Sequence, residues 1–225
     1  MRLTYILPLA AAAALVVPGV ACADSFSAPR PPATVGVQVS SLGGGLQFSE
    51  RLGFAADVRL ASGNLELNPS GTTDGFKYAG NAHLRNVAAL LDFHPLRSAF
   101  RLTAGMLFSH DGVDVTGTPQ DGTYTFNGHT YAANEVGVVN GSVHFGNMAP
   151  YVGIGFGEPR HARVFLTGDF GVALRSVQTS LTATGPATAL PQFAADLAKT
   201  RNDLNTTANI LRTYPVISLG LAARI

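Results

Sequence analysis

The stretch VFLTGDFGVALRS, residues 164–176, alternates between two chemically different faces. One face is mainly apolar and carries Val164, Leu166, Gly168, Phe170, Val172 and Leu174. The residues between them are Phe165, Thr167, Asp169, Gly171, Ala173 and Arg175. A period of two predicts a β-strand whose faces meet different surroundings. The second face is poorly suited to water, because it holds small residues and isolated charges, and it suits a narrow, crowded interior.

The same alternation recurs along the chain, and the segments that show it lie near 34–40, 44–48, 53–60, 86–94, 100–109, 149–157, 164–175 and 214–225. Small inward residues allow eight strands to close around a narrow lumen, with the apolar face toward lipid. The count is eight if the first hairpin turns at 42–44. It is seven if 34–48 is one strand, which would break the even-number rule. We therefore predict an all-β fold, an eight-stranded antiparallel transmembrane β-barrel over 34–225.

The connections between these strands alternate in length. Those at 49–51, 95–99 and 158–162 are short, and those at 61–76, 110–140 and 178–212 are long. Short periplasmic turns and long extracellular loops are typical of outer-membrane barrels, so we expect 61–76, 110–140 and 178–212 to be extracellular loops.

Two of these loops contain their own structural signals. Asn127-Gly128 within 123–131 predicts a tight hairpin. Apolar residues spaced by three, four and seven predict a helix over 190–212, which either lines the barrel mouth or packs on its rim.

The N-terminus has the pattern of an exported protein. Arg2, the apolar run 6–17 and the Ala21-Cys22-Ala23 site predict a signal peptide over 1–23. The alternative is a lipoprotein signal that is lipidated at Cys22. Residues 24–33 are rich in proline and predict an irregular periplasmic leader.

Charged residues on the small-residue face are the main candidate site. They are Asp57, Arg59, Asp92, Arg101, Asp169 and Arg175. Two interpretations stay open: a structural plug that fills the lumen, or a path that guides a zwitterion such as an amino acid. The facing also predicts that Val172→Arg impairs insertion, whereas Ala173→Arg is better tolerated.

Other candidate chemistry is weaker. Three aromatic residues of the 123–131 hairpin, Tyr124, Phe126 and Tyr131, are expected to be exposed and to make loop surface contacts. The six histidines lack metal-ligand spacing, so we predict no metal and no cofactor. Ser109 and His110 are adjacent and point to opposite faces of a strand, so we predict no enzyme. A net charge of +1 gives no basis for nucleic-acid binding.

Three functions follow from these patterns. The first is a narrow small-solute porin of the amino-acid type in the bacterial outer membrane. The second is a non-transporting barrel that acts as a structural protein, an adhesin or a surface-interaction protein through its loops. The third, a soluble lipocalin-like carrier, needs an apolar interior and inverts the observed pattern. Expected partners are outer-membrane lipid and lipopolysaccharide, the barrel assembly machinery and a small solute, and we expect a monomer.

The chain resembles a known family most clearly over about residues 100–225. The segments FNGHTYAANEVGVVNGSVHFGNMAPYVGIGFG (126–157), VFLTGDFGVALRSVQTSLTATG (164–185) and YPVISLGLAARI (214–225) are similar to CarO-type outer-membrane proteins. The resemblance implies an eight-stranded barrel and a role like that of ornithine-uptake porins. This chain departs from the pattern at Ala223 and Ile225, where aromatic residues are usual. The acidic residues of its 190–212 helix are offset by basic residues, so the family's preference for a cationic substrate is not expected for this chain.

Overall fold

The structure, a computed structural model, describes residues 32–225 except 54, 74–75, 96–97, 120–121 and 158–161. The predicted signal peptide (1–23) and most of the predicted leader (24–33) lie outside the described residues. None of the helices in the described ranges is both long enough and apolar enough to cross a membrane.

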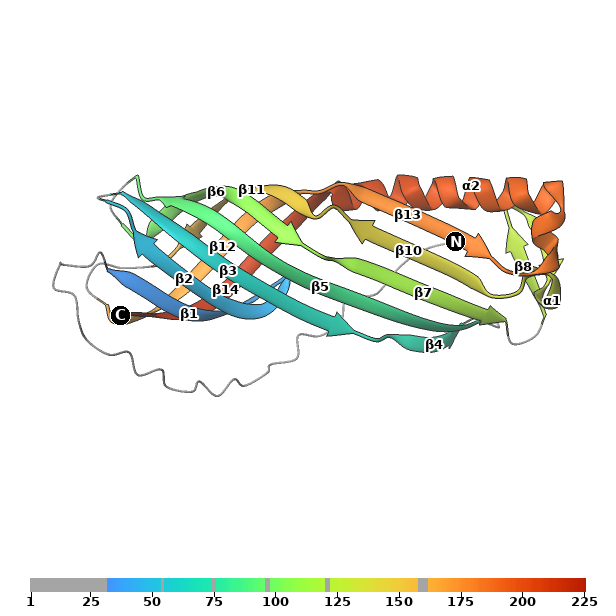
Figure 1. Cartoon of the computed structure of the whole chain (residues 1–225), viewed down its shortest axis with the longest axis horizontal. Coiled ribbons are helices and arrows are strands. Elements are labelled where there is room, and N and C mark those ends of the chain that lie inside the picture. Colours follow the sequence, from blue (N-terminus) through green and yellow to red (C-terminus); the bar gives the residue numbers. More distant parts are fainter. Residues whose placement is uncertain (1–31, 54, 74–75, 96–97, 120–121, 158–161) are drawn as a thin grey trace. The chain divides into compact units, whose positions relative to one another are not determined.

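Eight strands form a closed antiparallel barrel (Figure 1). They are β1 (Ala33–Ser40), β2 (Gly43–Arg51), β3 (Ala56–Leu67), β5 (Phe76–Phe93), β6 (Phe100–Ser109), β11 (Met148–Phe156), β12 (Val164–Leu174) and β14 (Thr213–Arg224). The ring closes because β1 pairs with β14 and β5 pairs with β6. The prediction of eight strands is confirmed, and the first hairpin consists of two strands.

The faces of the barrel strands follow the predicted alternation. On β12, Leu166 and Phe170 are 61% and 57% exposed, whereas Thr167 and Asp169 are buried. Exposed aliphatic and aromatic side chains around a closed barrel are the surface that a bilayer covers. The inner face is crowded at Ala173, which is fully buried and lies opposite Tyr151 and Tyr214 on the neighbouring strands. An arginine there would have to displace these rings, and the greater tolerance of Ala173→Arg than of Val172→Arg stays a prediction.

Three of the strands continue beyond the barrel as β7 (Gly112–Pro119), β10 (Val139–Phe145) and β13 (Val177–Ala183). They pair in the order β5, β7, β10, β13, with the first half of β5 as one member, and β4 (Ser70–Thr73) pairs with β5. We call this sheet the extension (Figure 1). The predicted loops 61–76, 110–140 and 178–212 are therefore partly wrong, because the period of two continues through much of them and forms strands.

The two ends of the barrel differ. Thr34 pairs with Arg224, so the first and last strands meet at the end where the short turns lie. Short turns and chain ends face the periplasm in outer-membrane barrels, which assigns the extension to the cell surface.

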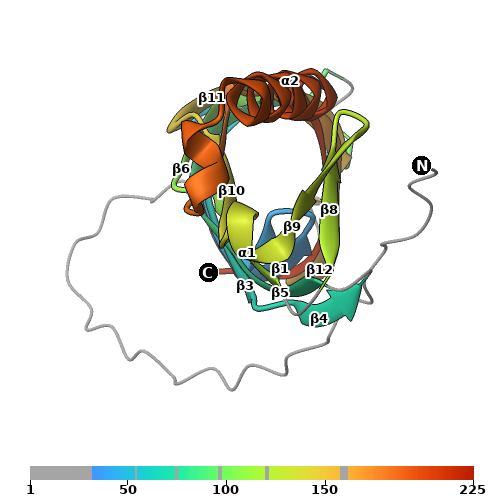
Figure 2. The same cartoon turned by 90° about the vertical axis from the view of Figure 1, so that its right-hand side faces the viewer.

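The helix predicted over 190–212 is present as α2 (Pro191–Ala208) followed by η2 (Asn209–Arg212). It contacts β13 and runs alongside the extension (Figure 1, Figure 2). The predicted hairpin is confirmed as β8 (Thr123–Phe126) and β9 (His129–Ala132), because Asn127 and Gly128 adopt the positive φ angles that its turn requires. With α1 (Ala133–Val136) and η1 (Pro186–Ala189), the hairpin forms a cap at the far end of the extension.

Candidate functional site

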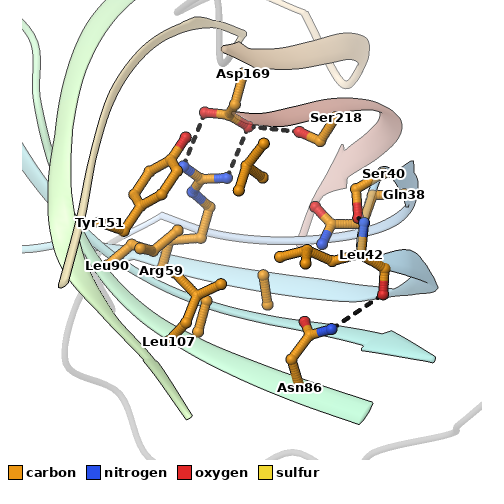
Figure 3. A pocket seen from close by; sticks show the side chains of 13 residues that line it. Gln38, Ser40, Leu42, Arg59, Asn86, Leu90, Leu107, Tyr151, Asp169 and Ser218 are labelled. Carbon is orange, nitrogen blue, oxygen red and sulfur yellow. Dashed lines mark hydrogen bonds and ion pairs between the residues drawn. The ribbon is translucent and has the colours of Figure 1, made fainter. Parts of the chain in front are cut away.

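A cluster of four charged side chains crosses the barrel interior. Arg59 on β3 donates from Nε to Asp92 on β5 (2.7 Å) and from Nη1 to Asp169 on β12 (2.9 Å). Arg101 on β6 donates from Nη2 to the same Asp169 (2.9 Å). The two positive charges of the arginines therefore balance the two negative charges of the aspartates. We call these four residues the central cluster. Figure 3 shows the pairing of Arg59 with Asp169.

Hydroxyl groups complete the central cluster. Thr103 donates to Asp92 (2.6 Å) and Ser218 donates to Asp169 (3.0 Å), the second of which is drawn in Figure 3. The four charged side chains are all at least nine-tenths buried. Removing one partner from a buried ion pair leaves the other charge uncompensated in a medium of low dielectric, which costs about 3–5 kcal/mol. The cluster therefore resists any change that separates its members.

Asp57, another predicted lumen residue, lies outside the central cluster. It is buried toward the turn end of the barrel, where Arg51 donates to one carboxylate oxygen (3.2 Å). His94 Nε2 lies 2.9 Å from the other oxygen. Asp57 therefore closes the periplasmic side of the interior rather than contributing to its centre.

Arg175, the last predicted lumen charge, lies at the opposite mouth of the barrel. Its Nη1 donates to Asp111 (2.6 Å), and both side chains are buried. The guanidinium carbon lies 5.4 Å and 4.9 Å from the ring centroids of Phe145 and Tyr214, so two cation–π contacts supplement the ion pair. Asp111 was not among the predicted lumen charges, because the segment 110–140 was predicted to be a loop. The signal was present, since Asp111 continues the odd-numbered inward positions of β6.

An apolar layer fills the lumen between these two ionic layers. It consists mainly of Leu42, Leu90, Leu107, Tyr151 and Val216, with alanines between them. Asn86 donates to the carbonyl oxygen of Leu42 (3.0 Å) and holds the β1–β2 turn inward, as Figure 3 shows. A cavity of about 40 Å³ remains beside the central cluster. That volume suits ordered water.

The aromatic residues of the hairpin contradict the prediction of surface contacts. Tyr124, Phe126 and Tyr131 are each less than a tenth exposed. The rings of Phe126 and Tyr131 pack edge-on against Phe193 of α2, with centroids 5.4 Å and 4.9 Å away. Their exposure was predicted wrongly because α2 returns from a distant part of the sequence and covers them.

A buried carboxylate joins the hairpin to α2. Asp196 accepts from Tyr131 Oη (2.6 Å) and from Asn127 Nδ2 (3.0 Å). The hydrogen bond from Tyr131 is the largest cause that holds the pKa of Asp196 below its usual value, followed by the bond from Asn127. The same interaction raises the pKa of Tyr131 to about 12.

The other sequence candidates do not assemble into a reactive site. Ser109 is buried toward the lumen, whereas His110 is exposed. Within the described part of the chain, no group of three or more histidine, cysteine, aspartate or glutamate side chains is placed to hold a metal ion.

Comparisons with known proteins agree on the fold. No family model matches the chain, and no curated protein matches its sequence. CarO2 of Acinetobacter baumannii superposes with a TM-score of 0.56 at 16% identity, over 87% of this chain and 99% of that one. CarO of the same organism gives 0.54 at 17% identity, over 85% and 97%. The chain therefore has the fold of a CarO-type barrel of the bacterial outer membrane, as the sequence resemblance implied.

Proposed function

We propose that the protein is a non-transporting outer-membrane barrel that anchors the extension at the cell surface, where the extension binds its ligand. The observation that carries the proposal is the filled lumen. The central cluster and the apolar layer lie in series, and the cavity that residues of both line has a volume of about 40 Å³. The immediate surroundings of such an anchor are outer-membrane lipid and lipopolysaccharide.

Energetics favour a closed barrel. A permeating solute would have to part Arg59 from two carboxylates, at about 3–5 kcal/mol for a broken buried pair. It would then have to displace Leu90 and Leu107, which are buried in the apolar layer of the lumen. A small polar solute offers no apolar surface in return for that displacement.

A narrow amino-acid porin is the second candidate, and one observation favours it. The small cavity is lined by both Arg59 and Asp169, which carry the two charges that a zwitterion needs from its partners. In this candidate, the ammonium and carboxylate of an amino acid would replace the ion pairs of the central cluster one after another.

Flux through liposomes separates the two candidates. The refolded protein is inserted, insertion is confirmed by a heat-dependent gel shift, and neutral, cationic and anionic amino acids are compared. We expect no flux through the natural protein and at most slight flux through the double variant Leu90→Ala, Leu107→Ala, because the variant thins the apolar layer while the central cluster still crosses the lumen. Flux through the natural protein that falls in Asp169→Asn would overturn the closed anchor and establish the porin. Leu219→Ala, which changes only the lipid face, is the matched control.

A further inference from the structure

The inward face of the extension is apolar, the reverse of the barrel interior below it. Its inward side chains include Val113, Val115, Val139, Val143 and Leu181. Neighbouring outward positions are polar and exposed, as at Asp114, Thr116, Asn140 and His144. The outward face therefore meets water, and the inward face needs an apolar partner.

Helix α2 supplies only part of that partner. A cavity of about 690 Å³ separates the inward face from Leu204, Ala208 and Leu211. No residue that lines this cavity within the described ranges is charged. Leu204 is 44% exposed and Ile210, also in the lining, is 76% exposed. A pocket of this size and character matches small-molecule sites, which are typically about 300–1,000 Å³ and mainly apolar.

We propose that this cavity binds one hydrocarbon chain of an amphiphile, with the polar head group left outside. The proposal rests on the proposed function, since it names the ligand class that the extension takes. The uncharged lining offers nothing to a charged head group and suits an unbranched apolar chain. A chain also explains why valine and leucine side chains line an otherwise unfilled space at the cell surface.

The cavity adjoins the lipid-facing surface of the barrel. Ile210 lies in η2, which leads directly into β14, and the outward Ile217 and Leu219 of β14 face lipid. Arg175 N donates to the carbonyl oxygen of Arg212 (2.7 Å), which fixes the end of η2 at the barrel rim. A chain from the outer leaflet would reach the cavity by passing the exposed Arg212 and Thr213, which stand between Leu211 and the lipid-facing part of β14.

A single tryptophan reports occupancy, because the natural sequence contains no tryptophan. Leu204→Trp places the reporter in the cavity. Asn202→Trp is the matched control, since a position two residues away on a helix faces the opposite side. Each variant is reconstituted in vesicles whose phospholipid chains are brominated, and separately in unlabelled vesicles to which a brominated free fatty acid is added. Bromine quenches tryptophan only on close contact.

We expect saturable quenching of Leu204→Trp and little quenching of Asn202→Trp. Quenching by the vesicle lipid identifies a membrane acyl chain, and quenching by the added fatty acid alone identifies a free one; both support the proposal. Equal quenching of the two variants, or none of either, would overturn it.

A blocking variant tests the site independently. A Cβ added at Gly141, which lines the cavity, meets only Leu181 Cδ1 at 3.7 Å and Val115 O at 4.0 Å. Gly141→Phe should therefore fill the cavity without disturbing the sheet. In the Leu204→Trp background, we expect Gly141→Phe to weaken binding of the brominated chain by about tenfold or more, because the phenyl ring occupies space that the chain needs. Unchanged quenching in a correctly inserted variant overturns the chain site, while amino-acid flux through the natural protein would instead overturn the closed anchor.

Discussion

The two halves of β5 have the same backbone direction and opposite chemistry. In the barrel half, inward Asn86 and Asp92 are buried, while outward Val87 and Leu91 are about half exposed. In the extension half, the outward residues become Lys77, Asn81 and Arg85 and the inward ones become Tyr78, Ala82 and Leu84. One strand therefore shows that the surrounding medium, lipid or water, decides which face is apolar. The alternation alone predicts a strand and leaves its surroundings open.

The largest expected effect comes from comparing ion pairs in the two regions. Arg59→Met leaves Asp92 and Asp169 short of a buried cation, and we expect a loss of about 3–5 kcal/mol in the free energy of unfolding. Asp114→Asn removes an exposed contact of the extension, in which His144 Nε2 lies 3.9 Å from the carboxylate and both side chains are half exposed. That loss should be below about 1 kcal/mol. Urea unfolding in vesicles measures both, and similar losses would contradict the buried character of the central cluster.

The next effect tests the outward faces directly. Leu219→Arg places a charge on the lipid face of β14 and should cost about 2–4 kcal/mol near the bilayer midplane. Thr116→Arg places the same charge on the outward face of β7 in the extension, where water solvates it. The yield of heat-modifiable protein after refolding into vesicles should fall for the first variant and stay unchanged for the second. An equal fall in the yields of both variants would mean that the extension also lies in lipid.

The smallest effect concerns the cap. The folded-state pKa of Asp196 lies below that of the unfolded chain, so its carboxylate stabilises the cap above about pH 4 and loses that effect as the pH falls further. Tyr131→Phe removes the largest cause of the lowered pKa, so the pKa of Asp196 should move up toward its usual value. Carboxyl NMR titration of both proteins measures the shift. An unchanged titration of Asp196 would show that Asn127 and His129, whose Nδ1 lies 2.9 Å from the carboxylate, maintain the lowered pKa without Tyr131.

The sequence predicted the barrel because period-two alternation is local and long in each strand. It also placed Asp57, Arg59, Asp92, Arg101, Asp169 and Arg175 on inward positions, and all six are buried. It did not predict how they pair. Which arginine meets which aspartate depends on strand register, for example Asp57 opposite Asp92 between β3 and β5, and register follows from pairings across the whole barrel.

The extension was missed although its alternation is equally regular. GVDVTGT (112–118) and VNGSVHF (139–145) alternate as clearly as the barrel strands do. Their inward face is apolar and their outward face is polar, so they did not match the pattern expected of membrane strands and were assigned to loops. The burial of Tyr124, Phe126 and Tyr131 had no local signal, because their cover is α2, some sixty residues later.

The seam between β1 and β14 has a consequence for how the molecule is made. Thr34 and Arg224 are direct partners, so the first strand waits for the last before one of its edges is paired. Contacts so distant in the chain form slowly, and an unpaired strand edge is a template for wrong association in the meantime. We therefore expect closure of the barrel to require the C-terminal strand, and the edge of β1 that pairs with β14 to be open to wrong association before that strand is added.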